Sequence, residues 1–164
     1  MKVVGLGAWC DYVTEDEYRE RRAGAGPPSE DGEQVPAPGL APVDEGEIEH
    51  FRRGASFDVH EFAVLANGRR LTLHSERGFG VSGPIDIWTH LTAASLEADV
   101  RTTVLPDDDD TGDDHPWEWL AGLLRAQGVK VSPEQLTTVP YTVEFSRRLS
   151  QRLQSLSERP GCDG

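Results

Sequence analysis

Six aspartates crowd into the eight positions from Asp107 to Asp114, directly before a histidine, a proline and an apolar segment that holds two tryptophans. Carboxylates gathered this closely repel one another unless a cation or a basic surface lies among them. Two chemistries follow from this pattern: coordination of a hard divalent cation, or capture of a positively charged partner. A solvated connecting loop is the third interpretation.

The spacing of the acidic run fits a calcium loop. The ligands of such a loop alternate along the chain, a glycine makes its sharp turn and a glutamate closes it. Residues 107–118 resemble an EF-hand loop in this respect, and the resemblance implies a calcium site. The ligand positions hold Asp107, Asp109, Thr111, Asp113, His115 and Glu118, with Gly112 at the turn. His115 is a poor calcium ligand, Asp114 stands where an apolar residue is usual, and no second loop is present to pair with this one.

The same run predicts a binding surface for a basic protein. Trp117 fits an apolar helical stripe, whereas Trp119 lies off that stripe and is expected to be an exposed anchor beside the charge. A carboxylate cluster of this kind accelerates association and can occupy a phosphate site, as in an inhibitor of a nuclease such as an immunity protein or antitoxin. The predicted partner-binding residues are Asp107, Asp108, Asp109, Asp110, Asp113, Asp114, Glu118 and Trp119.

One pair of residues offers catalytic chemistry instead. Glu61 and His74 are expected to face each other across a β-hairpin, where a carboxylate can orient and charge an imidazole for general-base work. The plainer interpretation is a polar cross-strand pair on a solvated face. This pair is the alternative function, a small enzyme.

Charge is distributed very unevenly along the chain. The net charge is −13, but residues 24–46 hold five acids and no base, and residues 107–118 hold seven acids and no base. The remaining 17 acids face 16 bases, so the body of the protein is nearly neutral. Direct binding to nucleic acid is not expected, because neutralising phosphates requires clustered Lys and Arg.

Cysteine and histidine usage argues against a disulfide framework and a zinc site. Cys10 and Cys162 are the two cysteines, and five scattered histidines form no metal-ligand motif. A membrane span is not expected either, since no apolar run approaches about 20 residues. These features predict a cytoplasmic protein with no bound cofactor other than the calcium considered above.

The clearest structural signal is a hairpin over residues 57–75, turning at Asn67 and Gly68. Asn-Gly suits a two-residue type I′ turn, which would pair Glu61 with His74 and place one set of side chains in the core. That predicted core set is Phe62, Val64, Leu71 and Leu73.

The rest of the chain predicts a mixed α+β domain, with a small, mostly antiparallel sheet covered by three to four helices. We expect an N-terminal strand and polar helix over 1–23, with a Thr14–Glu17 capping box at the start of the helix, a disordered Pro/Gly/acid-rich loop over 24–46, a main domain over 47–158 and a flexible tail over 159–164. Helices are expected near 86–98, 116–128 and 145–156, and after the capping box at 132–135. Strands are expected at 100–105 and 129–131, and 141–145 suits either a strand or a helix start.

Overall fold

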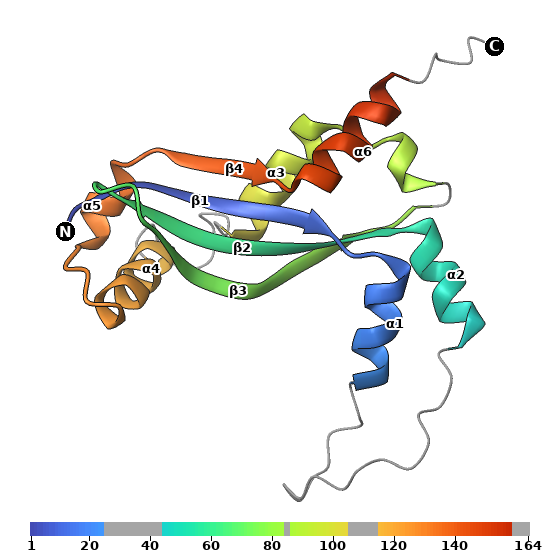
Figure 1. Ribbon diagram of the computed structural model, residues 1–164, viewed down its shortest axis with the longest axis horizontal. Helices are drawn as coiled ribbons and strands as arrows, with labels where there is room; N and C mark the ends of the chain where they lie inside the picture. The colour runs from blue at the N-terminus through green and yellow to red at the C-terminus, as the bar shows by residue number, and fades with distance from the viewer. Residues whose placement is uncertain (25–43, 84–85, 105–114, 159–164) are drawn as a thin grey trace, which may run out of the picture.

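The computed structural model describes residues 1–24, 44–83, 86–104 and 115–158, and it confirms the α+β class (Figure 1). Its elements are β1 (Val3–Tyr12), α1 (Glu15–Gly24), α2 (Glu45–Arg53), β2 (Ala55–Leu65), β3 (Arg70–Val81), the 3-10 turn η1 (Ile87–Thr89), α3 (Ala93–Val104), α4 (His115–Ala126), α5 (Pro133–Thr137), β4 (Tyr141–Phe145) and α6 (Arg147–Ser157). None of the described helices is long and apolar enough to cross a membrane.

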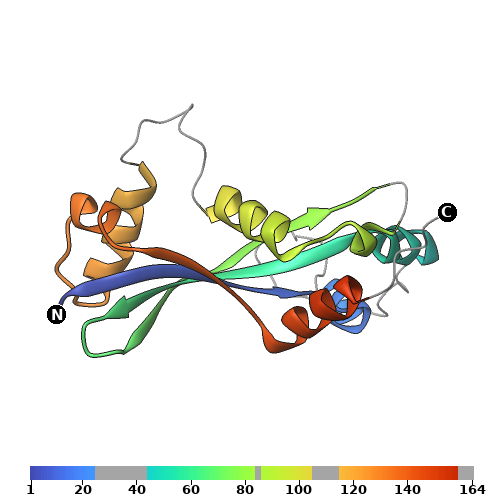
Figure 2. The same ribbon diagram turned by 90° about the horizontal axis from the view of Figure 1, so that it is seen from above.

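The four strands form one sheet in the order β3-β2-β1-β4. β1 runs antiparallel to β2 and parallel to β4, so the sheet is mostly antiparallel as predicted. The N-terminal strand β1 therefore lies in the interior of the sheet, between β2 and β4. Figure 2 shows α3, α4 and α5 on one side of the strands.

The covered face of the sheet carries two apolar clusters. The first lies beneath α3 and α6 and contains Ala8, Cys10, Ala55, Phe57, Val59, Trp88, Leu96, Val100, Val104, Leu149 and Leu153. The second lies beneath α4 and α5 and contains Val3, Leu6, Ala63, Leu65, Leu73, Leu120, Ala121, Leu124, Val129 and Leu136. Burial of these side chains supplies the main driving force for folding.

The hairpin is confirmed, but its turn is one residue longer than predicted. The amide of Gly68 donates to the carbonyl of Leu65 at 2.8 Å, and the amide of Leu65 donates to the carbonyl of Arg69 at 2.9 Å. Gly68 has a φ of 80°, whereas no described residue other than glycine has a positive φ. Asn67 therefore does not adopt the type I′ conformation, and the loop is a three-residue turn that ends in a glycine bulge.

The longer turn shifts β3 by one position and splits the predicted core set. Ala63 pairs with Leu71 and Phe62 with Thr72, so Leu71 and Leu73 join the cluster that contains Ala63. Phe62 is buried outside both clusters, and Val64 is only half-buried. A bulge at Leu73 then restores the predicted pairing of Glu61 with His74.

Two predicted strands are absent from the described chain. The strand expected at 100–105 is, through Val104, the last turn of α3, because Leu96, Val100 and Val104 recur at helical spacing and are all buried. Tertiary packing thus overrides the β-propensity of the two valines. Residues 129–131 form a connection that follows the positive-φ Gly128, while 141–145 is the strand β4.

A layer of side chains crosses the other face of the sheet. The Arg70 guanidinium lies 4.4 Å from the centroid of the Phe62 ring and forks onto the Glu144 carboxylate at 2.6 and 2.8 Å. The Phe62 ring itself lies over Gly7, where an added Cβ would come within 2.6 Å of the ring. Arg70 thereby links the two edge strands across the middle of the sheet, and Gly7 leaves room for the ring beneath it.

Replacing Gly7 with alanine should lower the free energy of unfolding by about 1–3 kcal/mol, because the new Cβ also meets the carbonyl of Thr142 at 2.6 Å. Urea unfolding measures the loss. Gly122→Ala is the control, because nothing lies within 4 Å of its added Cβ. Since glycine within a helix is less favourable than alanine, this change should raise the free energy of unfolding by about 0.5–1 kcal/mol. Equal stability of the Gly7→Ala variant and the parent chain would contradict the close packing of the Phe62 ring on Gly7.

Candidate functional site

The acidic run lies outside the described residues, so its metal and partner roles remain predictions. This applies to Asp107, Asp108, Asp109, Asp110, Thr111, Asp113 and Asp114. Within the described residues no three His, Cys, Asp or Glu side chains are close enough together to hold a metal ion. The run leads directly into α4, whose Leu120, Ala121 and Leu124 are at most 1% exposed. The acidic segment is therefore attached to a helix that is firmly packed on the sheet.

Glu118 is engaged within its own helix. Its carboxylate accepts a hydrogen bond from the Arg125 guanidinium at 2.6 Å, and the same guanidinium donates to the carbonyl of Ala121 at 3.2 Å. Both side chains are about half exposed. A metal ion or a basic partner that uses Glu118 must first displace Arg125.

Trp119 packs on the sheet as well as facing solvent. Its ring lies edge-on to the imidazole of His74, with centroids 5.2 Å apart and planes at 70°. The side chain is half-buried against the apolar cluster beneath α4. It thus joins the helix to β3 and offers a partner less surface than a fully exposed tryptophan would.

Glu61 and His74 face each other as predicted, but they do not lie on a solvated face, because Glu61 is buried and His74 packs against Trp119 of α4. Glu61 is 1% exposed, and both of its carboxylate oxygens are buried. The Nδ1 atom of His74 is also buried and makes no hydrogen bond among the described residues. The bulge at Leu73 explains this position, because it turns His74 to the same side of the sheet as Glu61. A carboxylate beside an imidazole can act as a general base only if substrate reaches it, and the burial of Glu61 opposes such access.

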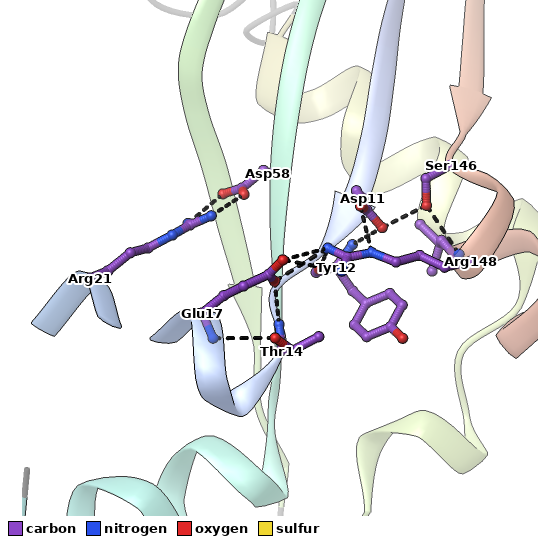
Figure 3. Close-up of polar contacts among 9 residues, drawn as sticks. Asp11, Tyr12, Thr14, Glu17, Arg21, Asp58, Ser146 and Arg148 are labelled. Atoms are coloured by element: carbon purple, nitrogen blue, oxygen red, sulfur yellow. Dashed lines mark hydrogen bonds and ion pairs between the residues drawn. The ribbon is translucent and has the colours of Figure 1, made fainter. Parts of the chain in front are cut away.

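A second polar cluster joins β1, α1 and α6 (Figure 3). Asp11 is 9% exposed, and its carboxylate accepts from the Ser146 hydroxyl at 2.6 Å, the Tyr12 amide at 2.8 Å and Nε of Arg148 at 2.7 Å. Ser146 Oγ accepts in turn from the amide of Leu149 and caps α6. The arrangement supports the fold, because Arg148 pairs with Asp11 and the Ser146 hydroxyl bonds both Asp11 and the first turn of α6.

Arg148 extends this cluster to the start of α1. Its guanidinium donates to the Tyr12 carbonyl at 2.8 Å and to the Glu17 carboxylate at 3.1 and 3.2 Å. Glu17 also forms the predicted capping box with Thr14, through bonds of 2.8 and 3.2 Å. The Thr14 amide and then Arg148 hold the pKa of Glu17 below its usual value. The stability that Glu17 provides is therefore present above its ordinary pKa and is lost as the pH falls through the lowered one.

Arg21 makes the matching contact between α1 and the sheet. Its guanidinium forks onto the Asp58 carboxylate of β2 at 2.9 and 2.6 Å (Figure 3). The bonds to Asp58 raise the pKa of Arg21. Sequence reasoning found the capping box of α1 but neither arginine contact, because the partners are far apart in the chain.

No protein-family model, curated protein or solved structure matches this chain.

Replacing Arg148 with alanine should cost about 1–3 kcal/mol of unfolding free energy, because the nearly buried Asp11 loses its cation. Arg148→Lys should recover only part of this loss, since an ammonium cannot make the forked contacts of a guanidinium. The neighbouring Arg147 is exposed and makes no ion pair within the described chain, so Arg147→Ala is the control and should change stability by less than about 0.5 kcal/mol. Urea unfolding that shows equal losses for Arg147→Ala and Arg148→Ala would refute the assigned role.

Proposed function

We propose that this chain is a protein-binding module that captures a basic partner protein through the acidic run ahead of α4. The observation that carries the proposal is the pairing of charges within the body. Arginines on α1, α2, β3, α3, α4 and α6 bond carboxylates of the described chain, for example Arg21 with Asp58, Arg70 with Glu144 and Arg148 with Asp11. The net charge of −13 is thus concentrated in segments outside these pairs.

A concentrated charge of this kind acts mainly on association. A cluster of carboxylates attracts a basic surface over roughly a Debye length, about 8 Å at physiological salt, and steers the encounter. The buried leucines of α4 support this role, because a firmly packed helix adjoining the run reduces the ordering cost of binding.

The finer proposal is an inhibitor. A nuclease binds phosphates with clustered cations, and a row of aspartates is chemically suited to cover such a cluster, as an immunity protein or antitoxin would. We propose a cytoplasmic location on the basis of cysteine usage, with two cysteines in the chain and Cys10 a buried free thiol.

The test is to change Asp107, Asp108, Asp109, Asp110, Asp113 and Asp114 together to asparagine. The parent chain, tagged at its C-terminal end, should capture one stoichiometric basic protein from nuclease-treated lysate of the source organism. The purified pair should associate more slowly as salt is raised. At low salt the asparagine variant should associate with the partner at least about tenfold more slowly than the parent chain does. Electrostatic steering contributes about 10- to 1000-fold to such association rates.

The control neutralises the other acidic segment, by Glu30→Gln, Asp31→Asn and Glu33→Gln. This variant should capture the partner nearly as well as the parent chain. The proposal would be contradicted if the Asp107–Asp114 variant captured the partner as well as the parent chain does. It would also be contradicted if the captured partner were acidic, or if the association rate did not depend on salt.

A further inference from the structure

A cavity of about 610 Å³ lies where the start of β1 meets the connection from α4 to β4. Residues 1–4 form one wall, and the other contains Lys130, Val131, Gln135, Thr138, Val139 and Pro140. Figures 1 and 2 both place the beginning of β1 beside α5. Neither Glu61 nor His74 lines this groove.

The groove is cationic in an acidic protein. Lys2 and Lys130 are the only lysines of the sequence, and both are exposed on its walls. Among the residues that the structure describes no acidic side chain lines it, although the chain has 29 acids and 16 Lys and Arg residues. Within the described parts of the chain neither lysine takes part in an ion pair. Two ammonium groups that face one groove, with no carboxylate from the described segments beside them, favour an anionic occupant.

The groove also borders an open sheet edge. β4 pairs with β1 only from Leu6 to Cys10, whereas β1 itself begins at Val3. The last described contact on that side is the bond from the Leu6 amide to the carbonyl of Pro140, a residue without an amide proton. Beyond it no described strand pairs with residues 3–5 on this side. An open edge of this kind accepts an added strand.

Apolar side chains complete the groove. Val4 is 41% exposed, and it lies where the pairing of β1 with β2 shifts register. Val131 and Val139 are half-buried on the opposite wall. An extended peptide directs alternate side chains to opposite sides, so it can place apolar groups against these valines while its acidic groups approach the lysines.

We propose that this groove binds an extended acidic peptide segment of a partner protein, which adds as a strand beside residues 2–5 at the start of β1 and pairs its carboxylates with Lys2 and Lys130. A small carboxylate compound would satisfy the lysines but would leave the strand edge unpaired. The site is independent of the proposed capture of a basic partner, since it lies on different residues and has the opposite charge.

The test starts from a phage library of random heptapeptides selected on the full chain, tagged at its C-terminal end. Enriched peptides should be net negative, with acids alternating with β-branched residues. A labelled synthetic copy of the leading peptide is then titrated by fluorescence anisotropy. Lys2→Glu with Lys130→Glu should weaken its binding about tenfold or more, because both attractions become repulsions.

The matched control is Arg69→Glu with Arg147→Glu. It reverses two exposed cations that make no ion pair within the described chain and lie outside the groove. The affinity of this control variant for the peptide should stay within about twofold of the parent's, since salt screens charges that lie far from the groove. Thermal melting should show that both double variants remain folded, because all four side chains are exposed.

Strand addition has its own readout. The bound peptide should slow amide hydrogen exchange in residues 3–5, and a copy N-methylated at alternate residues should bind at least about tenfold more weakly through loss of main-chain hydrogen bonds. Neutral or basic enriched peptides, unchanged affinity in the double lysine variant, or undiminished binding of the N-methylated peptide would overturn the proposal. A dimer of the parent chain that fills the groove and excludes the peptide would also overturn it.

Discussion

Guanidinium groups forked onto carboxylates hold this molecule together where apolar packing does not reach. Arg148 joins the end of β1 to the starts of α1 and α6, Arg70 links the two edge strands, and Arg21 fastens α1 to β2. Each contact uses the planar geometry that lysine lacks. Without these cations, Asp11 and Asp58 would leave negative charge at one end of the sheet with no compensation from the strands themselves.

The pairing of arginines with carboxylates limits which charges of the protein can meet a partner. Charges that bond one another inside the fold are not available to a partner, so we propose that recognition uses groups outside these pairs. The acidic run before α4 is one such group, and Lys2 with Lys130 in the groove beside β1 is another. The two have opposite charge, and both adjoin the α4–α5 part of the molecule. We infer a body that can hold an acidic and a basic segment at once.

Local patterns predicted much of the fold. The Thr14–Glu17 capping box, the hairpin and α4 with its terminal Gly128 follow from a few adjacent residues, and all are present. Nonlocal contacts decided the rest. One extra turn residue changed which side chains of β3 face the helices, and packing under the sheet made Val100 helical. The pairing of Glu61 with His74 was predictable, but the burial of Glu61 and the packing of His74 on Trp119 depend on contacts between distant segments. The groove joins residues from opposite ends of the sequence.

The central claim is that arginine pairing neutralises the folded body, and a carboxyl-carbon NMR titration tests it most directly. Hydrogen bonds from Arg52 and Arg19 lower the pKa of Glu15 to about 2, and Arg70 lowers the pKa of Glu144. We therefore expect Glu15, Glu17 and Glu144 to remain ionised at pH values where ordinary glutamates protonate. Glu15 and Glu144 should titrate normally after their arginines are replaced, whereas Glu17 should keep part of its lowered pKa after Arg148 is replaced, because the Thr14 amide also lowers it. Ordinary glutamate pKa values for all three in the folded parent chain would contradict the account.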